Sequence, residues 1–235
     1  MRFIWGAGTH QGVVRQNNED SLFPDSSGES DTQVTLMVAD GMGGHVAGEV
    51  ASRLAVNAAA SNDLEPADRV AAGNRAIREE VARDTALDGM GTTMTLVRLN
   101  PEGTADLGHV GDSRAYLLRD DDLRQLTEDH TVAAEYVAAG QISAEEAATH
   151  PQRHMLTRTL GLTRFVNVDE LQLDLQSGDR LLLCSDGLNE MVRDDGISGA
   201  LGDGSPDDAV WKLIDMANEA GGADNITVIV IDALD

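Results

Sequence analysis

Short apolar or alternating runs recur along the chain and predict β-strands. They cover residues 2–8, 33–39, 92–99, 104–110, 114–119, 180–184 and 226–231. Two of the connections between them, LNPEGTA and LRDDDLR, are short and polar, as hairpin loops are. Short loops favour antiparallel pairing of the strands they join. The pattern therefore predicts a core that is rich in antiparallel β-structure.

Three other segments have the spacing of amphipathic helices: 46–60, 66–83 and 206–220. In the first, Val46, Val50 and Leu54 fall on one apolar stripe. Proline near the first turn opens the other two, and paired glycines follow the third. Because strands and helices do not alternate strictly, the order indicates a mixed α+β sandwich with helices outside the sheets, and no Rossmann fold.

One long segment, residues 128–163, has short helical stretches and few strand signals. It lies between strands, where connections are usually short. An excursion of this length is often a lid or a substrate-facing insertion. We expect it to border the functional site.

The amino-acid composition excludes some classes of binding partner. The 235 residues include 41 acidic and 17 basic side chains, for a formal net charge of −24. This charge repels nucleic acid and anionic membranes, so we expect contact with neither. The lone Cys184 lies in an apolar run, which favours a buried structural thiol in a reducing compartment.

No run reaches the roughly 18 apolar residues of a membrane span, and the first residues do not resemble a signal peptide. The chain is therefore expected to be soluble and cytoplasmic. An apolar run close to the last residue leaves open whether it is a fragment of a longer, membrane-anchored protein.

Two Asp-Gly pairs differ from ordinary turns. Asp40-Gly41 and Asp186-Gly187 each end a strongly apolar run, TLMVAD and LLLCSD, of the kind found in buried central strands. An ionisable group at the rim of the core is costly unless a cation or hydrogen bonds compensate.

Three further aspartates flank apolar runs: Asp20 closes RQNNED, Asp112 follows LGHVG, and Asp224 precedes NITVIVI. Converging carboxylates suit a hard divalent cation such as magnesium or manganese. In so acidic a chain, plain turns and helix caps remain the alternative interpretation. The sequence lacks a Walker loop, a GxSxG elbow, a CxxC pair, an EF-hand loop and zinc-ligand spacing.

Eight motifs together resemble one family. They are VRQNNED (14–20), VADGMGGHVAGEVAS (38–52), GMGTTMT (89–95), GHVGDSRAYLL (108–118), LTEDHT (126–131), HMLTRTLG (154–161), GDRLLLCSDGL (178–188) and DNITVIVI (224–231). In this order they are similar to the metal-dependent protein phosphatases, the protein phosphatase 2C-like (PPM) family. The likeness spans about residues 3 to 231 and is greatest to compact bacterial members that oppose Ser/Thr kinases.

The resemblance implies a four-layer αββα sandwich, two antiparallel sheets flanked by helix pairs, in a single catalytic domain over residues 1–235 with a flap at about 128–163. It also implies hydrolysis of phosphoserine and phosphothreonine by a water that bridges two Mn²⁺ or Mg²⁺ ions, with a possible third ion. Phosphorylated proteins, including Ser/Thr kinases, would be the partners of a monomeric enzyme.

Site residues follow from the same motifs. Asp40 would bridge both ions, and the Gly41 carbonyl would bind one. Asp186 and Asp224 would hold the first ion. The remaining roles are Asp20 at the second ion, partly through water, Glu19 just outside it, Asp112 at a third ion, and Arg15 on the substrate phosphate.

The sequence departs from the family pattern at two positions. Human-type members have a histidine, proposed as a general acid, where this chain has Met42, so the source of the leaving-group proton stays open. His45, His109 and His154 lie in or near the motifs, but we interpret each as structural. Relatives often have an aspartate near Thr9, where we expect little consequence.

Two other classes of function remain. One is a catalytically silent phosphopeptide-binding module on the same fold, which the loss of Asp40, Asp186 or Asp224 would have favoured. The other is an acidic protein that binds calcium without catalysis, which a preference for calcium over manganese would reveal.

Overall fold

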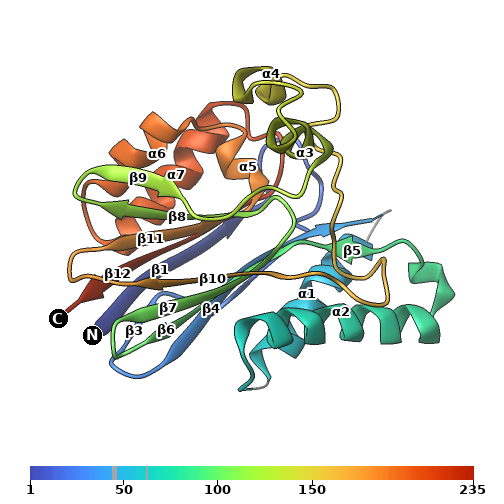
Figure 1. The fold of residues 1–235 in the computed structure, drawn as a ribbon, viewed down its shortest axis with the longest axis horizontal. Coiled ribbons are helices and arrows are strands. Elements are labelled where there is room, and N and C mark those ends of the chain that lie inside the picture. The colour runs from blue at the N-terminus through green and yellow to red at the C-terminus, as the bar shows by residue number, and fades with distance from the viewer. Residues whose placement is uncertain (44–46, 62) are drawn as a thin grey trace.

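The computed structural model describes residues 1–43, 47–61 and 63–235, and its strands form two sheets (Figure 1). The first has the order β3 (Gly28–Ser30), β1 (Arg2–His10), β12 (Ile226–Leu234), β11 (Arg180–Cys184), β8 (Arg114–Arg119) and β9 (Asp122–Gln125). The second has the order β10 (Asp169–Asp174), β7 (Thr104–Val110), β6 (Met94–Asn100), β4 (Val34–Met42) and β2 (Asp20–Phe23). The short β5 (Gly91–Thr92) also pairs with β4. All these pairings are antiparallel.

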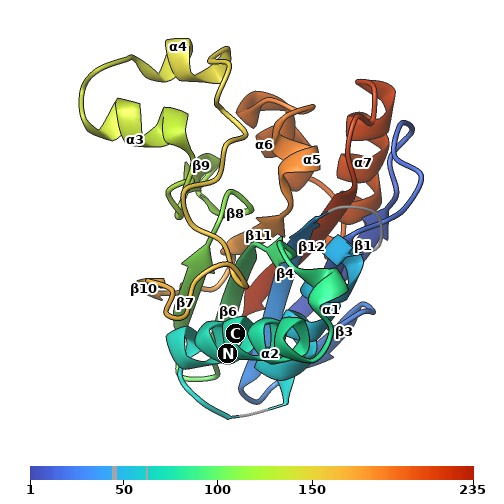
Figure 2. The same cartoon turned by 90° about the vertical axis from the view of Figure 1, so that its right-hand side faces the viewer.

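Helices cover the outer face of each sheet (Figures 1 and 2). Against the second sheet lie α1 (Ala47–Ala60) and α2 (Pro66–Arg83), with a 3₁₀ turn at Thr85–Leu87. Against the first lie α5 (Asp186–Asn189), α6 (Asp194–Leu201) and α7 (Pro206–Glu219). Proline at the first turn helps to start α2 and α7, and Ser205 and Asp208 form a capping box on α7.

Three apolar clusters hold these layers together. One lies between the sheets and includes Phe3, Leu36 and Ile229. The other two lie under the helices of each outer face, around Leu213 on one side and Ile77 on the other. The predicted pair of antiparallel sheets flanked by helices is therefore confirmed.

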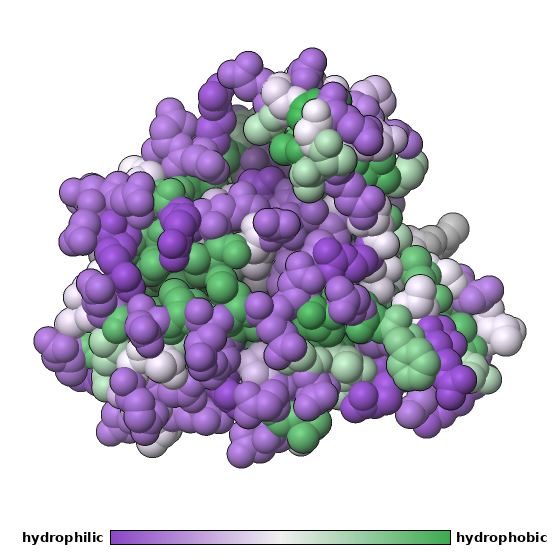
Figure 3. All heavy atoms as spheres, in the orientation of Figure 1, coloured by the Kyte–Doolittle hydropathy of each residue, from purple (hydrophilic) through white to green (hydrophobic). Residues whose placement is uncertain are grey.

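The segment at residues 128–163, here called the flap, contains the two short helices α3 (Val132–Ala138) and α4 (Ala144–Ala148). Figure 2 shows both helices standing away from the sheets and from α5–α7. Side chains of Thr131 and Ser143 cap them. Hydrophilic residues predominate on the molecular face in Figure 3. Among the described residues, no helix is both long and apolar enough to cross a membrane.

Several boundaries differ from those predicted. Asp40 does not end its strand, because β4 continues through Gly41 to Met42 and pairs with β5. The predicted strand at 92–99 is divided between β5 and β6. The predicted helix at 46–60 is described from Ala47, and Val46 and His45 lie outside the described residues.

Candidate metal centre

Five aspartates are positioned by strands of both sheets. Asp20 is the first residue of β2 and pairs across the strands with Asp40 in β4. Asp112 lies in the turn between β7 and β8. From the other sheet, Asp186 follows β11 as the first residue of α5, and Asp224 shortly precedes β12. The centre thus forms where the two sheets meet at one end of the sandwich.

Electrostatics show that these carboxylates act on one another. Burial is the main cause that raises the pKa of Asp40, and the charges of Asp20, Asp186 and Asp112 raise it further. Burial raises the pKa of Asp20 to about 7 and that of Asp186 to about 6, with neighbouring carboxylates adding to both shifts. So many acids in one place disfavour their own ionisation unless positive charge is supplied.

Carboxylate oxygens without a hydrogen-bond partner indicate which kind of ligand the centre suits. Oδ1 of Asp20 and Oδ1 of Asp186 are both buried, and neither has a hydrogen-bond partner among the described residues. Buried polar atoms are normally paired, so each exception calls for a ligand, water or ion. A set of carboxylate oxygens is the donor type that Mg²⁺ and Mn²⁺ prefer. The residues present therefore fit divalent cations.

Hydroxyl groups hold Asp20 in place. Ser185 Oγ and Thr227 Oγ1 donate to Asp20 Oδ2 over 2.7 and 2.6 Å, and the Thr227 amide donates to Ser185 Oγ over 2.9 Å. With Oδ2 held in this way, Oδ1 is the oxygen that stays without a hydrogen-bond partner among the described residues. The sequence analysis missed both hydroxyls, although they lie inside the CSDG and DNIT motifs.

Threonines of the GTTMT motif fix the backbone of Asp40. Its amide donates to Thr93 Oγ1 over 2.9 Å, and its carbonyl accepts from Thr92 Oγ1 over 2.7 Å. Thr93 Oγ1 is also 2.7 Å from Ser113 Oγ, next to Asp112. This chain of hydroxyls links two of the carboxylate-bearing segments.

Close backbone packing explains the glycines of the two Asp-Gly pairs. A Cβ at Gly41 would come within 2.2 Å of the Gly48 carbonyl oxygen and 2.5 Å of the Glu19 carbonyl oxygen. A Cβ at Gly187 would lie 2.0 Å from the carbonyl oxygen of Asn225. Neither position has room for a side chain, so the backbone packs tightly directly after each carboxylate.

Arg15 lies on a loop at the rim of the centre. Its Nη2 is 2.5 Å from Asp224 Oδ2, and half of its side chain (52%) is exposed. A pocket of about 200 Å³ opens beside it, lined by Arg15, Gln16, Asn17, Glu19, Gly43 and Asn225. The guanidinium therefore faces both the carboxylates and accessible space.

Asn225 was also missed, yet it fastens this loop. Its Oδ1 accepts from the Glu19 amide over 2.8 Å. Its Nδ2 donates to the carbonyls of Gln11 and Asn17 over 2.8 and 2.9 Å. One buried side chain thus positions the loop of Arg15 and Glu19 next to Asp224.

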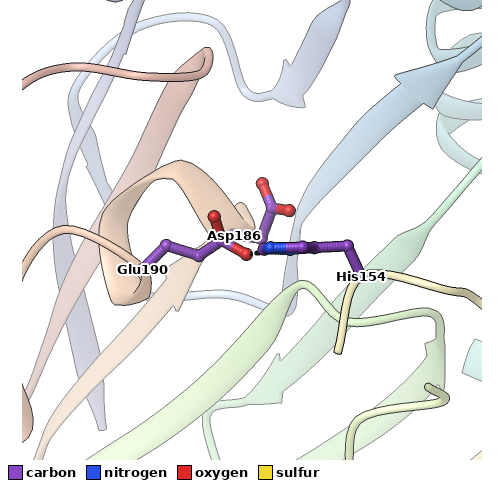
Figure 4. Close-up of side chains that lie close together, drawn as sticks. All are labelled: His154, Asp186 and Glu190. Atoms are coloured by element: carbon purple, nitrogen blue, oxygen red, sulfur yellow. Dashed lines mark ion pairs between the residues drawn. The ribbon is translucent and has the colours of Figure 1, made fainter. Parts of the chain in front are cut away.

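A histidine of the flap reaches the centre. His154 Nδ1 pairs with the Glu190 carboxylate, and each of His154, Asp186 and Glu190 offers a ligand atom within 4.8 Å of the others (Figure 4). Burial raises the pKa of Glu190 to about 7. Glu190 lies four residues after Asp186, one helical turn away, which is the signal that could have identified it. His154 is 43% exposed, so it is no core residue, whereas His109 is buried.

Comparison with known proteins gives a consistent result. A family model described as protein phosphatase 2C matches residues 7–203. The serine/threonine protein phosphatase PstP of Mycobacterium tuberculosis is 42% identical over 98% of this chain. This chain spans only 45% of that protein's length. A serine/threonine phosphatase of Listeria welshimeri is 38% identical and is covered over 93% of its length.

Solved structures agree in fold. The crystal structure of the Mycobacterium tuberculosis phosphatase PstP/Ppp is 40% identical, with a TM-score of 0.91 and full coverage of both chains. The catalytic domain of PstP in complex with two manganese ions is 38% identical, with a TM-score of 0.88 and full coverage of both chains.

Proposed function

This chain belongs to the protein phosphatase 2C family, and from that premise we propose that it is a divalent-metal-dependent protein serine/threonine phosphatase. The observation that carries the proposal is the cluster of Asp20, Asp40, Asp112 and Asp186, in which two buried carboxylate oxygens have no hydrogen-bond partner among the described residues. Such a cluster is stable in its ionised form only with cations bound.

The proposed ligands are those of the family pattern. Asp40 would bridge two ions, Gly41 would offer its carbonyl to one of them, and Asp186 and Asp224 would hold the first ion. Asp20 would serve the second ion, with Glu19 just outside it. Asp112 serves a third ion. Manganese or magnesium fits these oxygen donors, and the relative with two manganese ions supports at least two sites.

The chemistry that two bound divalent cations supply is Lewis-acid stabilisation of the phosphoryl group and a lowered pKa for the attacking water. The chain's own residues do the rest. Arg15 offers a fork of N–H donors to two phosphate oxygens, and its exposure next to the pocket suits an incoming substrate. Asn225 keeps the loop of Arg15 at the rim of the carboxylates.

We further propose that residues 1–235 act as one monomeric catalytic domain in the cytoplasm, on phosphoserine and phosphothreonine in proteins. Ser/Thr kinases are among the proposed substrates. The flap borders the centre through His154, so its sequence is placed to influence which phosphoproteins are accepted.

The deciding experiment is hydrolysis of p-nitrophenyl phosphate and of a phosphothreonine peptide, first with manganese and then with a chelator. We expect metal-dependent turnover in the wild-type protein and none in Asp40→Asn or Asp186→Asn, with the fold intact by circular dichroism. Asp195→Asn, an exposed aspartate of α6, is the matched control and should retain full activity.

Two results would overturn the proposal. Tight phosphopeptide binding without any turnover would indicate a silent binding module. Calorimetry that showed calcium preferred over manganese, again without turnover, would indicate a calcium-binding protein.

A further inference from the structure

The base of the flap is a pair of chain segments that run side by side. Thr131 and Leu156 form an antiparallel bridge between them. The Thr157 amide donates to the carbonyl of His130 over 2.8 Å, and the Val132 amide donates to the carbonyl of Met155 over 2.9 Å. These bonds join the two ends of the flap. His130 lies in this paired base, which is called the foot of the flap below.

His130 bonds twice to the residue before Asp112. Its amide donates to the Gly111 carbonyl over 2.8 Å, and the Gly111 amide donates to His130 Nδ1 over 3.0 Å. Gly111 has a φ of +114°, which favours glycine, and a Cβ there would lie 2.5 Å from Thr93 Cβ. The turn that presents Asp112 is thus held from one side by close packing and from the other by the foot of the flap.

The far side of the same imidazole contacts Asp169, which lies just beyond the flap and is also bonded by Arg158 of the flap. His130 Nε2 is 3.0 Å from Asp169 Oδ2, and Arg158 Nη1 is 2.5 Å from Asp169 Oδ1. Asp169 begins the edge strand β10. Since Nδ1 accepts from Gly111, Nε2 must carry the proton of the neutral ring and donate it to Asp169.

Burial restricts the orientation of the His130 ring. His130 is only 2% exposed, and burial lowers its pKa. Its ring lies 4.8 Å from that of His109, a second buried histidine that is bonded to Thr95 Oγ1. A neutral ring with one acceptor and one donor, each used, has a single orientation here.

We propose that His130 is a positioning residue that fixes the foot of the flap and the Asp112 carboxylate relative to each other. Its neutral imidazole joins Gly111 to Asp169, and its backbone carbonyl accepts from Thr157 at the other end of the flap. Loosening the flap then displaces Asp112, and displacing Asp112 loosens the flap. This inference rests on the proposed function only for its catalytic consequence, because the hydrogen bonds can be tested without activity.

Two substitutions of His130 distinguish its side-chain hydrogen bond to Gly111 from that to Asp169. His130→Ala removes both side-chain bonds. His130→Asn retains an acceptor close to the place of Nδ1 but cannot reach Asp169. His150→Ala is the matched control, since this flap histidine bonds within the flap, where Nδ1 accepts from the Gln152 amide.

Amide hydrogen exchange in the metal-free proteins measures directly how firmly these hydrogen bonds hold the flap. In His130→Ala, exchange of the Gly111 and Thr157 amides should accelerate by about tenfold or more, as both flap ends open locally. His130→Asn should restore most of the Gly111 protection, and His150→Ala should leave both amides unchanged. Thermal unfolding identifies a variant that fails to fold, in which case the Asn variant decides the question.

Calorimetry of manganese binding provides a second test, because a residue with a merely structural role would leave the manganese affinity unchanged. The weakest manganese site should lose about tenfold in affinity in His130→Ala and recover in His130→Asn, with the other sites unchanged. Unchanged Gly111 exchange or unchanged manganese affinity in His130→Ala would overturn the proposal. Absence of turnover in the wild-type protein would instead overturn the proposed function, and the exchange data would still decide the role of His130.

Discussion

Asp20 and Asp40 are direct cross-strand partners in the antiparallel pair β2–β4. Like charges opposite each other weaken a sheet, and here Asp20 is buried and Asp40 is half-buried. Ser185 and Thr227 compensate one oxygen of Asp20 and leave the other unpaired. The strand pair therefore carries an electrostatic cost that cations would remove.

This cost predicts how the metal-free protein responds to pH. Because the pKa of Asp20 is raised to about 7 in the folded state, the folded state holds a proton that the unfolded chain releases near its ordinary pKa of 3.8. The free energy of unfolding should therefore fall as pH rises from about 4 to about 7. Thermal unfolding in chelator should show a lower midpoint at pH 7.5 than at pH 5.

Asp20→Asn should remove part of this dependence. We expect its metal-free form to unfold about 3 °C or more above the wild type at pH 7.5, and manganese to stabilise it less. An Asp20→Asn midpoint that falls with pH as steeply as the wild-type midpoint would contradict the account.

Arg15→Ala should mainly raise the KM for a phosphopeptide, by roughly tenfold, with a smaller change in kcat. A guanidinium that contacts phosphate in the ground state and the transition state alike contributes uniform binding. Steady-state kinetics at saturating manganese measure both constants. Arg53→Ala, which removes an exposed arginine of α1 paired with Glu49, is the control. A large fall in kcat at constant KM would exclude the assigned role.

Gly41→Ala should destabilise the protein and abolish manganese binding, because the new methyl group would collide with the backbone carbonyls of Gly48 and Glu19. Neither partner is a flexible side chain that could move aside. Gly199→Ala is the matched control, since a Cβ at this exposed helical position meets nothing within 4 Å. It should stabilise the protein by up to about 1 kcal/mol. Equal melting curves for the two variants would refute the packing argument.

Asn225→Ala should cost about 1–3 kcal/mol in the free energy of unfolding, because it leaves the Glu19 amide and two loop carbonyls without their side-chain partner. The loop of Arg15 should also loosen, so the KM for phosphopeptide should rise. Urea unfolding and kinetics check the two effects, with the exposed Asn57→Ala in α1 as control. A KM that stays at the wild-type value would show that Arg15 is placed by other contacts.

Central elements could be predicted from the sequence because burial imposes a strong pattern on them. Strands β11 and β12 are almost wholly apolar along their buried lengths, with Thr227 the buried polar exception in β12, and α2 begins at the predicted Pro66. The sequence analysis missed β2, β3, β9 and β10, all of which lie at sheet edges. In β10, most side chains stay at least partly exposed and the alternation is weak. Edge strands take much of their definition from the neighbour they pair with, which local sequence does not reveal.

The candidate site divides in the same way. The carboxylates could be found because charge beside an apolar run is visible locally, as at Asp40 and Asp186. Ser185 and Asn225 could not, since an ordinary polar residue becomes informative only when its distant partner is known. The end of β4 was misplaced for a related reason: Asp40 is followed by two more paired residues, and that pairing is with β5, about fifty residues further along the chain.

The last strand of the fold, β12, lies in the middle of its sheet, between β1 and β11, with Arg2 opposite Leu234. During synthesis, β1 can therefore pair with β12 only after β12 has left the ribosome. Asp224 and Asn225 directly precede β12 in the chain, so the centre can be completed only after this part of the chain has been synthesised. A nascent chain that ends before Asp224 would hold Asp20, Asp40, Asp112 and Asp186 but not Asp224, so we expect it to lack the complete centre.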